Sequence, residues 1–169
     1  MQKYAALLRA VNVGGTGKLP MAELRKMCAD AGFQNAKTLL ASGNVVFETT
    51  LSKQDAHTAL SSKLRDHFGT DIGLFILDGA QMRAVYDANP FSDHPPSQIG
   101  VLFVNDLPTP EYCQSAKGLK DEVMISDAGV LFIKFPSGMG KSKLAVPSAD
   151  KGTMRNMNTV RKLADLLNE

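Results

Sequence analysis

Residues 37–47 read KTLLASGNVVF and predict a β-hairpin. Its strands are residues 37–40 and 45–47, and the turn between them, SGN, is made of residue types that turns favour. Apolar residues recur at helical spacing on both sides of the hairpin. The hairpin is therefore expected to lie between two helices.

The helix before the hairpin is predicted from apolar residues that recur every three or four positions and stop at Gly32: Met21, Leu24, Met27, Cys28 and Ala31. The helix after it is predicted from a capping box of Ser52 and Asp55. Its apolar residues follow four positions apart: Ala56, Leu60, Leu64 and Phe68.

Two apolar segments complete the first half of the chain. Tyr4 to Val11 and Ile72 to Leu77 both read as strands, which gives the order βαββαβ within residues 1–77. This order predicts a ferredoxin-like subdomain, an antiparallel four-stranded sheet with two helices on one face.

Residues 78–169 predict a second α+β subdomain that nearly repeats the first. Asp78 is expected to cap a helix, and a strand (Ile99 to Val104), a short helix from Thr109-Pro110 and a hairpin around residues 127–129 follow. Thr153 is expected to cap the final helix. Counted from Ile99, the order is βαββα, one strand short of a full ferredoxin-like unit. The missing strand is either taken from the region of residues 72–77 or absent.

Composition excludes several classes of protein. With 44 % hydrophobic and 21 % charged residues, the 169-residue chain is not a disordered polypeptide. No apolar run approaches the roughly 18 residues that a membrane span needs. Residues 1–13 contain Arg9 and lack a small-residue cleavage site, so they do not resemble a signal peptide. A cytoplasmic protein without a membrane partner is expected.

The charge is polarised along the chain. Residues 1–26 carry a net charge of +4, residues 27–133 a net charge of −6, and residues 134–162 a net charge of +6. Such asymmetry favours a local anion site over a basic protein that coats nucleic acid. The alternative is ordinary surface charge.

Five segments in fixed order carry a resemblance to a known family: LRAVNVGG (8–15), KLPMAEL (18–24), ASGNVVF (41–47), KSKL (141–144) and TMRNMNTV (153–160). Together they resemble the bacterial family called domain of unknown function 1697 over nearly the whole chain. The resemblance implies two ferredoxin-like α+β subdomains and no established activity. The chain has Ala10 where the family usually has Gly, and Met157 where it usually has Trp.

The first candidate site is formed by two loops. In a βαββαβ unit the first two strands run the same way, so the loop after each lies at one edge of the sheet. Backbone N–H groups, a helix N-terminus and a lysine at that edge suit an anion. The alternative is that both segments are turns whose glycines meet backbone geometry. The candidate residues are Arg9, Asn12, Gly14, Gly15, Lys18, Ser42, Gly43 and Asn44.

Two nucleotide-binding motifs fail in this chain. Leu19 follows Gly17-Lys18 where a P-loop needs Ser or Thr, and Gly140-Lys141-Ser142 has Phe135 at the position of the first glycine. The Rossmann pattern G-x-G-x-x-G does not occur. No cofactor is therefore predicted.

The second candidate site surrounds the predicted start of the last helix. Arg155 and Asn158 are three residues apart and are expected on one helix face, where arginine can clamp a phosphate and asparagine can bind a base edge or an amide. The alternative is a capped surface helix with solvated charges. The candidate residues are Lys141, Ser142, Lys143, Arg155, Asn156 and Asn158.

Metal-binding and catalytic patterns are scarce. Cys28, Cys113 and the three histidines form no pair with metal-ligand spacing, so no metal site and no disulfide framework are predicted. Cys28 is expected to be a buried thiol. His94, in a proline-rich loop, is the histidine with most freedom to act as an acid or base, although an exposed loop histidine is the simpler interpretation.

Three functions follow from these observations. The preferred one is a module that binds a phosphate-bearing ligand, either a nucleotide or a single-stranded nucleic acid, through basic, glycine-rich loops. The alternatives are an enzyme acting on a small phosphorylated metabolite, and a protein-interaction module without a ligand. The oligomeric state is not predicted.

Overall fold

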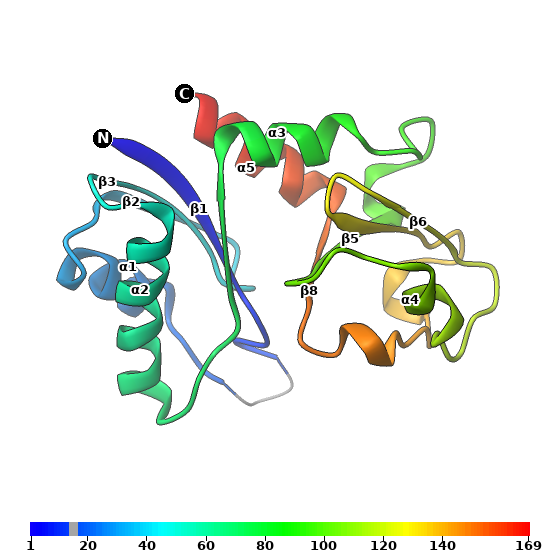
Figure 1. The fold of residues 1–169 in the computed structure, drawn as a ribbon, viewed down its shortest axis with the longest axis horizontal. Coiled ribbons are helices and arrows are strands. Elements are labelled where there is room, and N and C mark those ends of the chain that lie inside the picture. The colour runs from blue at the N-terminus through cyan, green and yellow to red at the C-terminus, as the bar shows by residue number, and fades with distance from the viewer. Residues whose placement is uncertain (14–16) are drawn as a thin grey trace. The chain divides into compact units, whose positions relative to one another are not determined.

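The computed structural model describes residues 1–13 and 17–169 (Figure 1). Its contacts divide the chain into two units, Met1–Gln81 with Asp165–Glu169, and Met82–Ala164. Each unit contains a four-stranded antiparallel sheet, which confirms the predicted α+β class with two ferredoxin-like sheets. None of the helices in the described ranges combines the length and the apolarity that a bilayer span requires.

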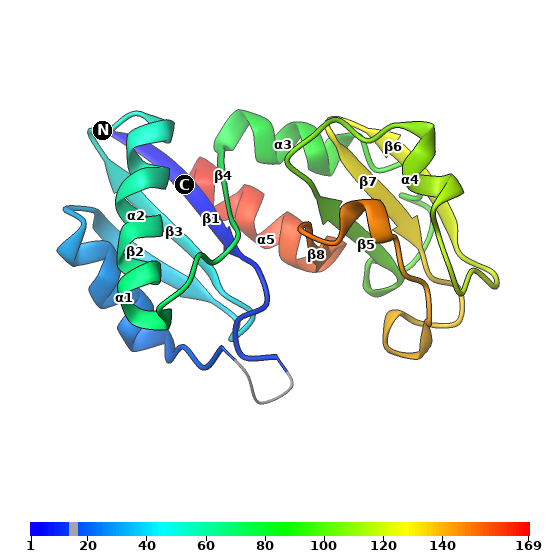
Figure 2. The same cartoon turned by 60° about the horizontal axis from the view of Figure 1, so that its bottom comes forward.

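The first unit has the predicted order of elements: β1 (Gln2–Leu8), α1 (Met21–Asp30), β2 (Gln34–Leu39), β3 (Asn44–Thr49), α2 (Lys53–Phe68) and β4 (Leu74–Asp78). The strands lie in the order β2-β3-β1-β4, the ferredoxin-like arrangement. Helices α1 and α2 lie along one face of this sheet (Figure 2). The capping box is confirmed, since the Ser52 hydroxyl accepts a hydrogen bond from the Asp55 amide at 3.1 Å.

The core of the first unit fills the space between the sheet and these two helices. Alternate residues of β1, namely Tyr4, Ala6 and Leu8, face the helices and are buried. Phe33 and Phe47 stack in this core with ring centroids 4.2 Å apart. Cys28 is fully buried, as expected. Burial raises the pKa of its thiol to about 12, because desolvation penalises the thiolate.

A β-bulge interrupts the edge strand β2. Gln34 pairs with Glu48 and Lys37 pairs with Val46, so two residues of β2 stand opposite one residue of β3. One of the two, Asn35, has a positive φ of 53°. The bulge shapes the sheet face that points away from α1 and α2.

The second unit contains the remaining elements: most of α3 (Gly79–Asp87), β5 (Ile99–Phe103), α4 (Pro110–Gln114), β6 (Val123–Asp127), β7 (Val130–Lys134), β8 (Thr153–Asn156) and the greater part of α5 (Met157–Asn168). Three short 3-10 turns lie at Pro96–Gln98, Met139–Lys141 and Pro147–Ala149. The strand order β6-β7-β5-β8 repeats that of the first sheet. The core on one face is formed by Leu102, Tyr112, Leu131, Ile133, Phe135 and Ala149.

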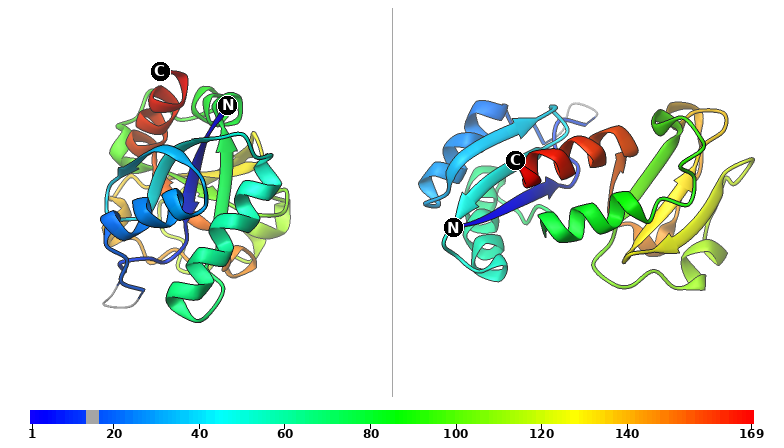
Figure 3. Two further views of the ribbon diagram at one scale, coloured as in Figure 1. Left: turned by 90° about the vertical axis from the view of Figure 1, so that its left-hand side faces the viewer. Right: turned by 90° about the horizontal axis from the view of Figure 1, so that it is seen from above.

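The prediction that this unit lacks a strand is wrong. Residues Thr153–Asn156 form β8, which pairs with β5 through Phe103 and Thr153 and through Val101 and Arg155. The chain then runs directly from β8 into α5 (Figure 3). Because pairing with β5 extends this short segment, Thr153 does not cap the last helix. Asn156 does so instead, since its Oδ1 accepts a hydrogen bond from the Thr159 amide at 3.0 Å.

Candidate anion-binding site

The two loops of the first predicted site meet at one edge of the first sheet. The Leu8 amide donates to the Gly43 carbonyl at 2.8 Å, and the Asn12 side chain donates to the Ala41 carbonyl at the same distance. The segment after β1 and the β2–β3 turn therefore lie together, as the topology predicts. Gly14 and Gly15 lie outside the described residues.

The amides at this edge hold the turns themselves. Asn12 Nδ2 donates to the Leu19 and Ala41 carbonyls, and Oδ1 accepts from the Leu19 amide, all at 2.8 Å. Asn44 is buried and donates to the Leu39 carbonyl at 2.7 Å and to the Ser42 hydroxyl at 3.0 Å. Side chains with these bonds close a loop, and they have few donors left for a ligand.

The other residues of the first predicted site differ in exposure. A Cβ atom on Gly43, at φ 86°, would stand 2.5 Å from a Val11 methyl group, so close packing requires this glycine. Arg9 is half-buried, with its aliphatic stem against Gly73. Lys18 is exposed and is the basic side chain that this edge presents to solvent most openly.

The structure separates the members of the second predicted site. Arg155 lies on β8 and Asn158 on α5, so the expectation that they share a helix face is wrong. Arg155 is only 7 % exposed, and its guanidinium donates to the Thr153 hydroxyl at 2.8 Å and to the Met154 carbonyl at 2.9 Å. Burial lowers its pKa to about 10, because desolvation penalises the charged form. Arg155 therefore lies in the protein interior, where its guanidinium is bonded to neighbouring residues of β8.

The remaining residues of the second predicted site lie in the loop between β7 and β8 or at the helix start. Lys141 and Lys143 are exposed. The Ser142 hydroxyl donates to the Glu122 carboxylate, which lowers the pKa of that carboxyl below its usual value. Asn156 is the helix cap. Asn158, one of the six predicted residues, lines a cavity of the second unit.

That cavity has a volume of about 250 Å³ and lies wholly within the second unit. It is bordered by α3, by the loop that follows α3 and by the first turns of α5. Its polar wall includes Tyr86, Asn89, His94, Asn158 and Arg161.

Two residues of α5 that line this cavity, Asn158 and Arg161, carry hydrogen-bond donors. Asn158 and Arg161 are three residues apart, so they lie on the same face of the helix. Arg161 is exposed and has no ion pair with any residue that the structure describes. The acid in the cavity wall, Asp87, is already paired with Arg83 at 3.0 Å. The formal charge around the cavity therefore favours an anion.

His94 also lines the cavity, and its contacts hold the ring in a fixed orientation. Its Nε2 lies 3.2 Å from Lys134 Nζ. An ammonium group can only donate, so Nε2 accepts this hydrogen bond and the proton of the neutral ring is on Nδ1, 3.6 Å from Asp93 Oδ1. The ring also stacks on Phe91 with an interplanar angle of 6°, and Lys134 Nζ lies 5.5 Å from the Phe91 ring centroid.

The sequence does not predict most of the residues that form this cavity. No sequence motif predicts a site at Tyr86, Asn89, Lys134 or Arg161. The sequence favours an exposed loop histidine at His94, whereas its side chain is 35 % exposed. The spacing of Asn158 and Arg161 is a usable signal only when the helix is known to begin at Met157. Among the described residues, no group of three or more His, Cys, Asp or Glu side chains is arranged to hold a metal ion.

Comparisons with known proteins agree with this fold. A family model described as a protein of unknown function (DUF1697) matches residues 1–132, which include His94 but not Asn158 or Arg161. No curated protein matches the chain. The conserved bacterial protein SP0830 from Streptococcus pneumoniae has a similar solved structure, with a TM-score of 0.79 and 26 % identity. The match covers 100 % of this chain and 99 % of that protein.

Proposed function

This chain belongs to the DUF1697 family of proteins of unknown function, and we propose that it binds a small phosphate-bearing ligand in the cavity of its second unit. The observation that carries this proposal is that Arg161 and Asn158, on one face of α5, line the same cavity as His94. The family is one of unknown function, so the proposal rests on the chemistry of these side chains.

Each group has a definite part in the proposed complex. Arg161 forms paired hydrogen bonds with two phosphate oxygens, which a planar guanidinium does well. The amide of Asn158 donates to a third oxygen. The first turn of α5 contributes the positive end of its dipole, which adds to the attraction for an anion. Lys134 adds a further positive charge behind His94.

The size of the cavity favours a small ligand over an oligonucleotide. About 250 Å³ is slightly below the range of roughly 300–1,000 Å³ that is usual for small-molecule sites. A ferredoxin-like sheet that binds single strands presents aromatic side chains on an open face. Here the strand aromatics Tyr4, Phe47 and Phe103 are buried in the interior, and Phe75 on β4 is half-buried. A phosphate monoester, such as a mononucleotide, fits these observations better.

Binding is favoured over catalysis by the state of His94. A general base needs a free ring nitrogen, and the Nε2 lone pair of His94 is directed at Lys134 Nζ. The ring is thus a fixed wall of the cavity with a donor on Nδ1. The proposed ligand is therefore phosphate-bearing, as the sequence predicts. Its proposed site is the cavity of the second unit and not the glycine-rich loop.

Isothermal titration calorimetry with inorganic phosphate and with AMP tests this proposal. Arg161→Ala is expected to raise the Kd by about tenfold or more, as for the loss of one charge-assisted contact. Lys162→Ala is the matched control, because Lys162 is the adjacent exposed base on the same helix and does not line the cavity. Equal affinities of the two variants would contradict the assignment of the site.

A further inference from the structure

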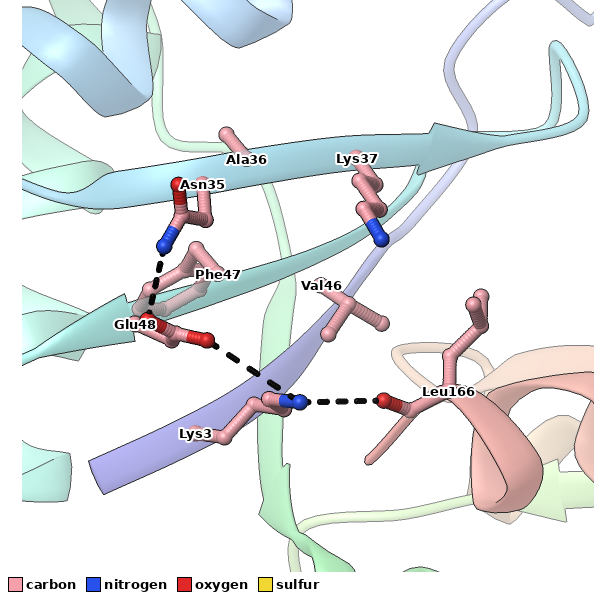
Figure 4. A pocket seen from close by; sticks show the side chains of 8 residues that line it. All are labelled: Lys3, Asn35, Ala36, Lys37, Val46, Phe47, Glu48 and Leu166. Carbon is pink, nitrogen blue, oxygen red and sulfur yellow. Dashed lines mark hydrogen bonds and ion pairs between the residues drawn. The ribbon is translucent and has the colours of Figure 1, made fainter. Parts of the chain in front are cut away.

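The first unit holds a larger cavity that the proposed function does not use. Its volume is about 420 Å³, and Figure 4 shows the side chains that surround it. Strands β1, β2 and β3 form its floor, and Leu166, near the end of α5, borders it. All of these residues belong to the first unit, because Asp165–Glu169 group with that unit.

The strand register brings four side chains to one face of the sheet. Lys3 pairs with Glu48 and Lys37 pairs with Val46, and side chains directly opposite each other point the same way. This face is turned away from α1 and α2, since the alternate residues of the same strands fill the core beneath those helices. The result is an apolar floor at Val46 with charged groups around it.

The β-bulge positions the acidic group of the cavity. Asn35, held at a positive φ of 53° in the bulge, donates from Nδ2 to Glu48 Oε2 at 2.8 Å. Bulges often redirect a side chain beside a functional site. Here the bulge fixes the Glu48 carboxylate at one end of the cavity.

The two lysines are only loosely engaged. Lys3 Nζ lies 3.9 Å from Glu48 Oε1 and 3.5 Å from the Leu166 carbonyl oxygen, both long contacts. Lys37 forms no ion pair or side-chain hydrogen bond with the residues that the structure describes. Two cations and one anion give the cavity a net charge of +1, which one monovalent anion neutralises.

We infer that this cavity binds a small monocarboxylate with an apolar body. The carboxylate lies between Lys37 and Lys3, and the apolar part packs on Val46 and Leu166. A phosphate dianion suits this cavity poorly, because Glu48 and the carbonyl at the negative end of α5 repel a second negative charge. The chemistry therefore differs from that of the anion site in the second unit.

A two-dimensional NMR titration of the ¹⁵N-labelled full chain tests this inference, with isovalerate as the probe. Isovalerate is expected to produce saturable shifts in the amides of Lys37, Val46 and Glu48. Isovaleramide, its neutral counterpart, and inorganic phosphate are expected to leave these amides unchanged. Equal shifts with isovaleramide, or isovalerate shifts confined to residues 86–94 and 158–161, would overturn the proposed site.

Variants of Lys37 test whether this lysine contacts the carboxylate of isovalerate. Lys37→Ala is expected to raise the Kd for isovalerate by about tenfold. Lys37→Gln, which keeps the length of the side chain and removes its charge, is expected to do the same, so a folding defect of one variant does not decide the result. Lys63→Ala, on α2 and outside the cavity, is expected to keep the wild-type affinity. Wild-type affinity in both Lys37 variants would refute the carboxylate contact.

Discussion

Lys134 Nζ lies 3.2 Å from His94 Nε2, and this contact ties the loop after α3 to strand β7. The same ammonium group lies over the ring of Phe91, on which His94 stacks. One lysine thus fixes both the orientation of the imidazole and the position of a buried aromatic residue beside it. The wall of the cavity in the second unit depends on this arrangement, because no regular secondary structure supports His94 locally.

Lys134→Ala is expected to lower the free energy of unfolding by about 1–2 kcal/mol, through loss of the hydrogen bond and the contact with the Phe91 ring. Urea denaturation followed by circular dichroism measures this change. The exposed Lys120→Ala, in the same unit, serves as the control and is expected to stay within about 0.5 kcal/mol of the wild type. A Lys134 variant as stable as the control would show that the contact does not hold the loop.

Asn12→Ala is expected to destabilise the chain by about 2–3 kcal/mol, because the side chain makes three hydrogen bonds at 2.8 Å. The backbone adds to this loss, since Asn12 has a φ of 55° that asparagine tolerates better than alanine. Asn12→Gly removes the side-chain bonds and relieves the backbone, so thermal unfolding of both variants separates the two effects. If phosphate affinity fell while stability stayed unchanged, Asn12 would be a ligand residue and its structural role would be refuted.

Asn156→Ala is expected to cost about 1 kcal/mol of stability, because it removes the side-chain cap of α5. Asn156→Asp keeps an acceptor at the cap and is expected to be nearly neutral. Chemical denaturation compares the two variants. Equal losses in both would show that the role of Asn156 is other than capping.

Ser142→Ala is expected to raise the pKa of Glu122 toward its ordinary value, because the Ser142 hydroxyl is the largest cause of the lowered pKa. A carboxyl whose pKa is lower in the folded than in the unfolded protein stabilises the fold above its unfolded pKa. That contribution is lost as the pH falls through the folded pKa. Carbon-detected NMR titration of the glutamate carboxyl measures the shift. An unchanged titration curve for Glu122 in the variant would contradict the hydrogen bond.

The first unit could be predicted well from the sequence because its signals are local. The capping box at Ser52 and the four-residue spacing from Ala56 to Phe68 identify α2 without reference to the rest of the chain. Strand β8 could not be predicted in the same way. Thr153–Asn156 contains one β-branched residue and is extended because it pairs with β5, a segment about 50 residues earlier. Because the helix is predicted to start at Thr153 and not at Met157, Arg155 is predicted on an exposed helix face. In the structure it is buried on β8.

The candidate site was predicted only in part, for a related reason. The residue type and position of Asn158 predict a ligand contact, and Asn158 does line a cavity. Its neighbours His94 and Arg161 come from segments far apart in the sequence, and tertiary packing alone brings them together. The composition of the glycine-rich loop is typical of an anion-binding loop, and the sequence therefore predicts a site there. In the structure, the Asn12 side chain closes that loop through its own hydrogen bonds.

A two-dimensional NMR titration of the ¹⁵N-labelled full chain with AMP, read residue by residue, locates the phosphate site. The proposed site predicts saturable shifts in the amides of residues 89–94 and 157–161, which Arg161→Ala abolishes and Lys162→Ala preserves. Saturable shifts confined to residues 17–19 and 41–44, or no shifts at all, would contradict a phosphate-binding site in the second unit.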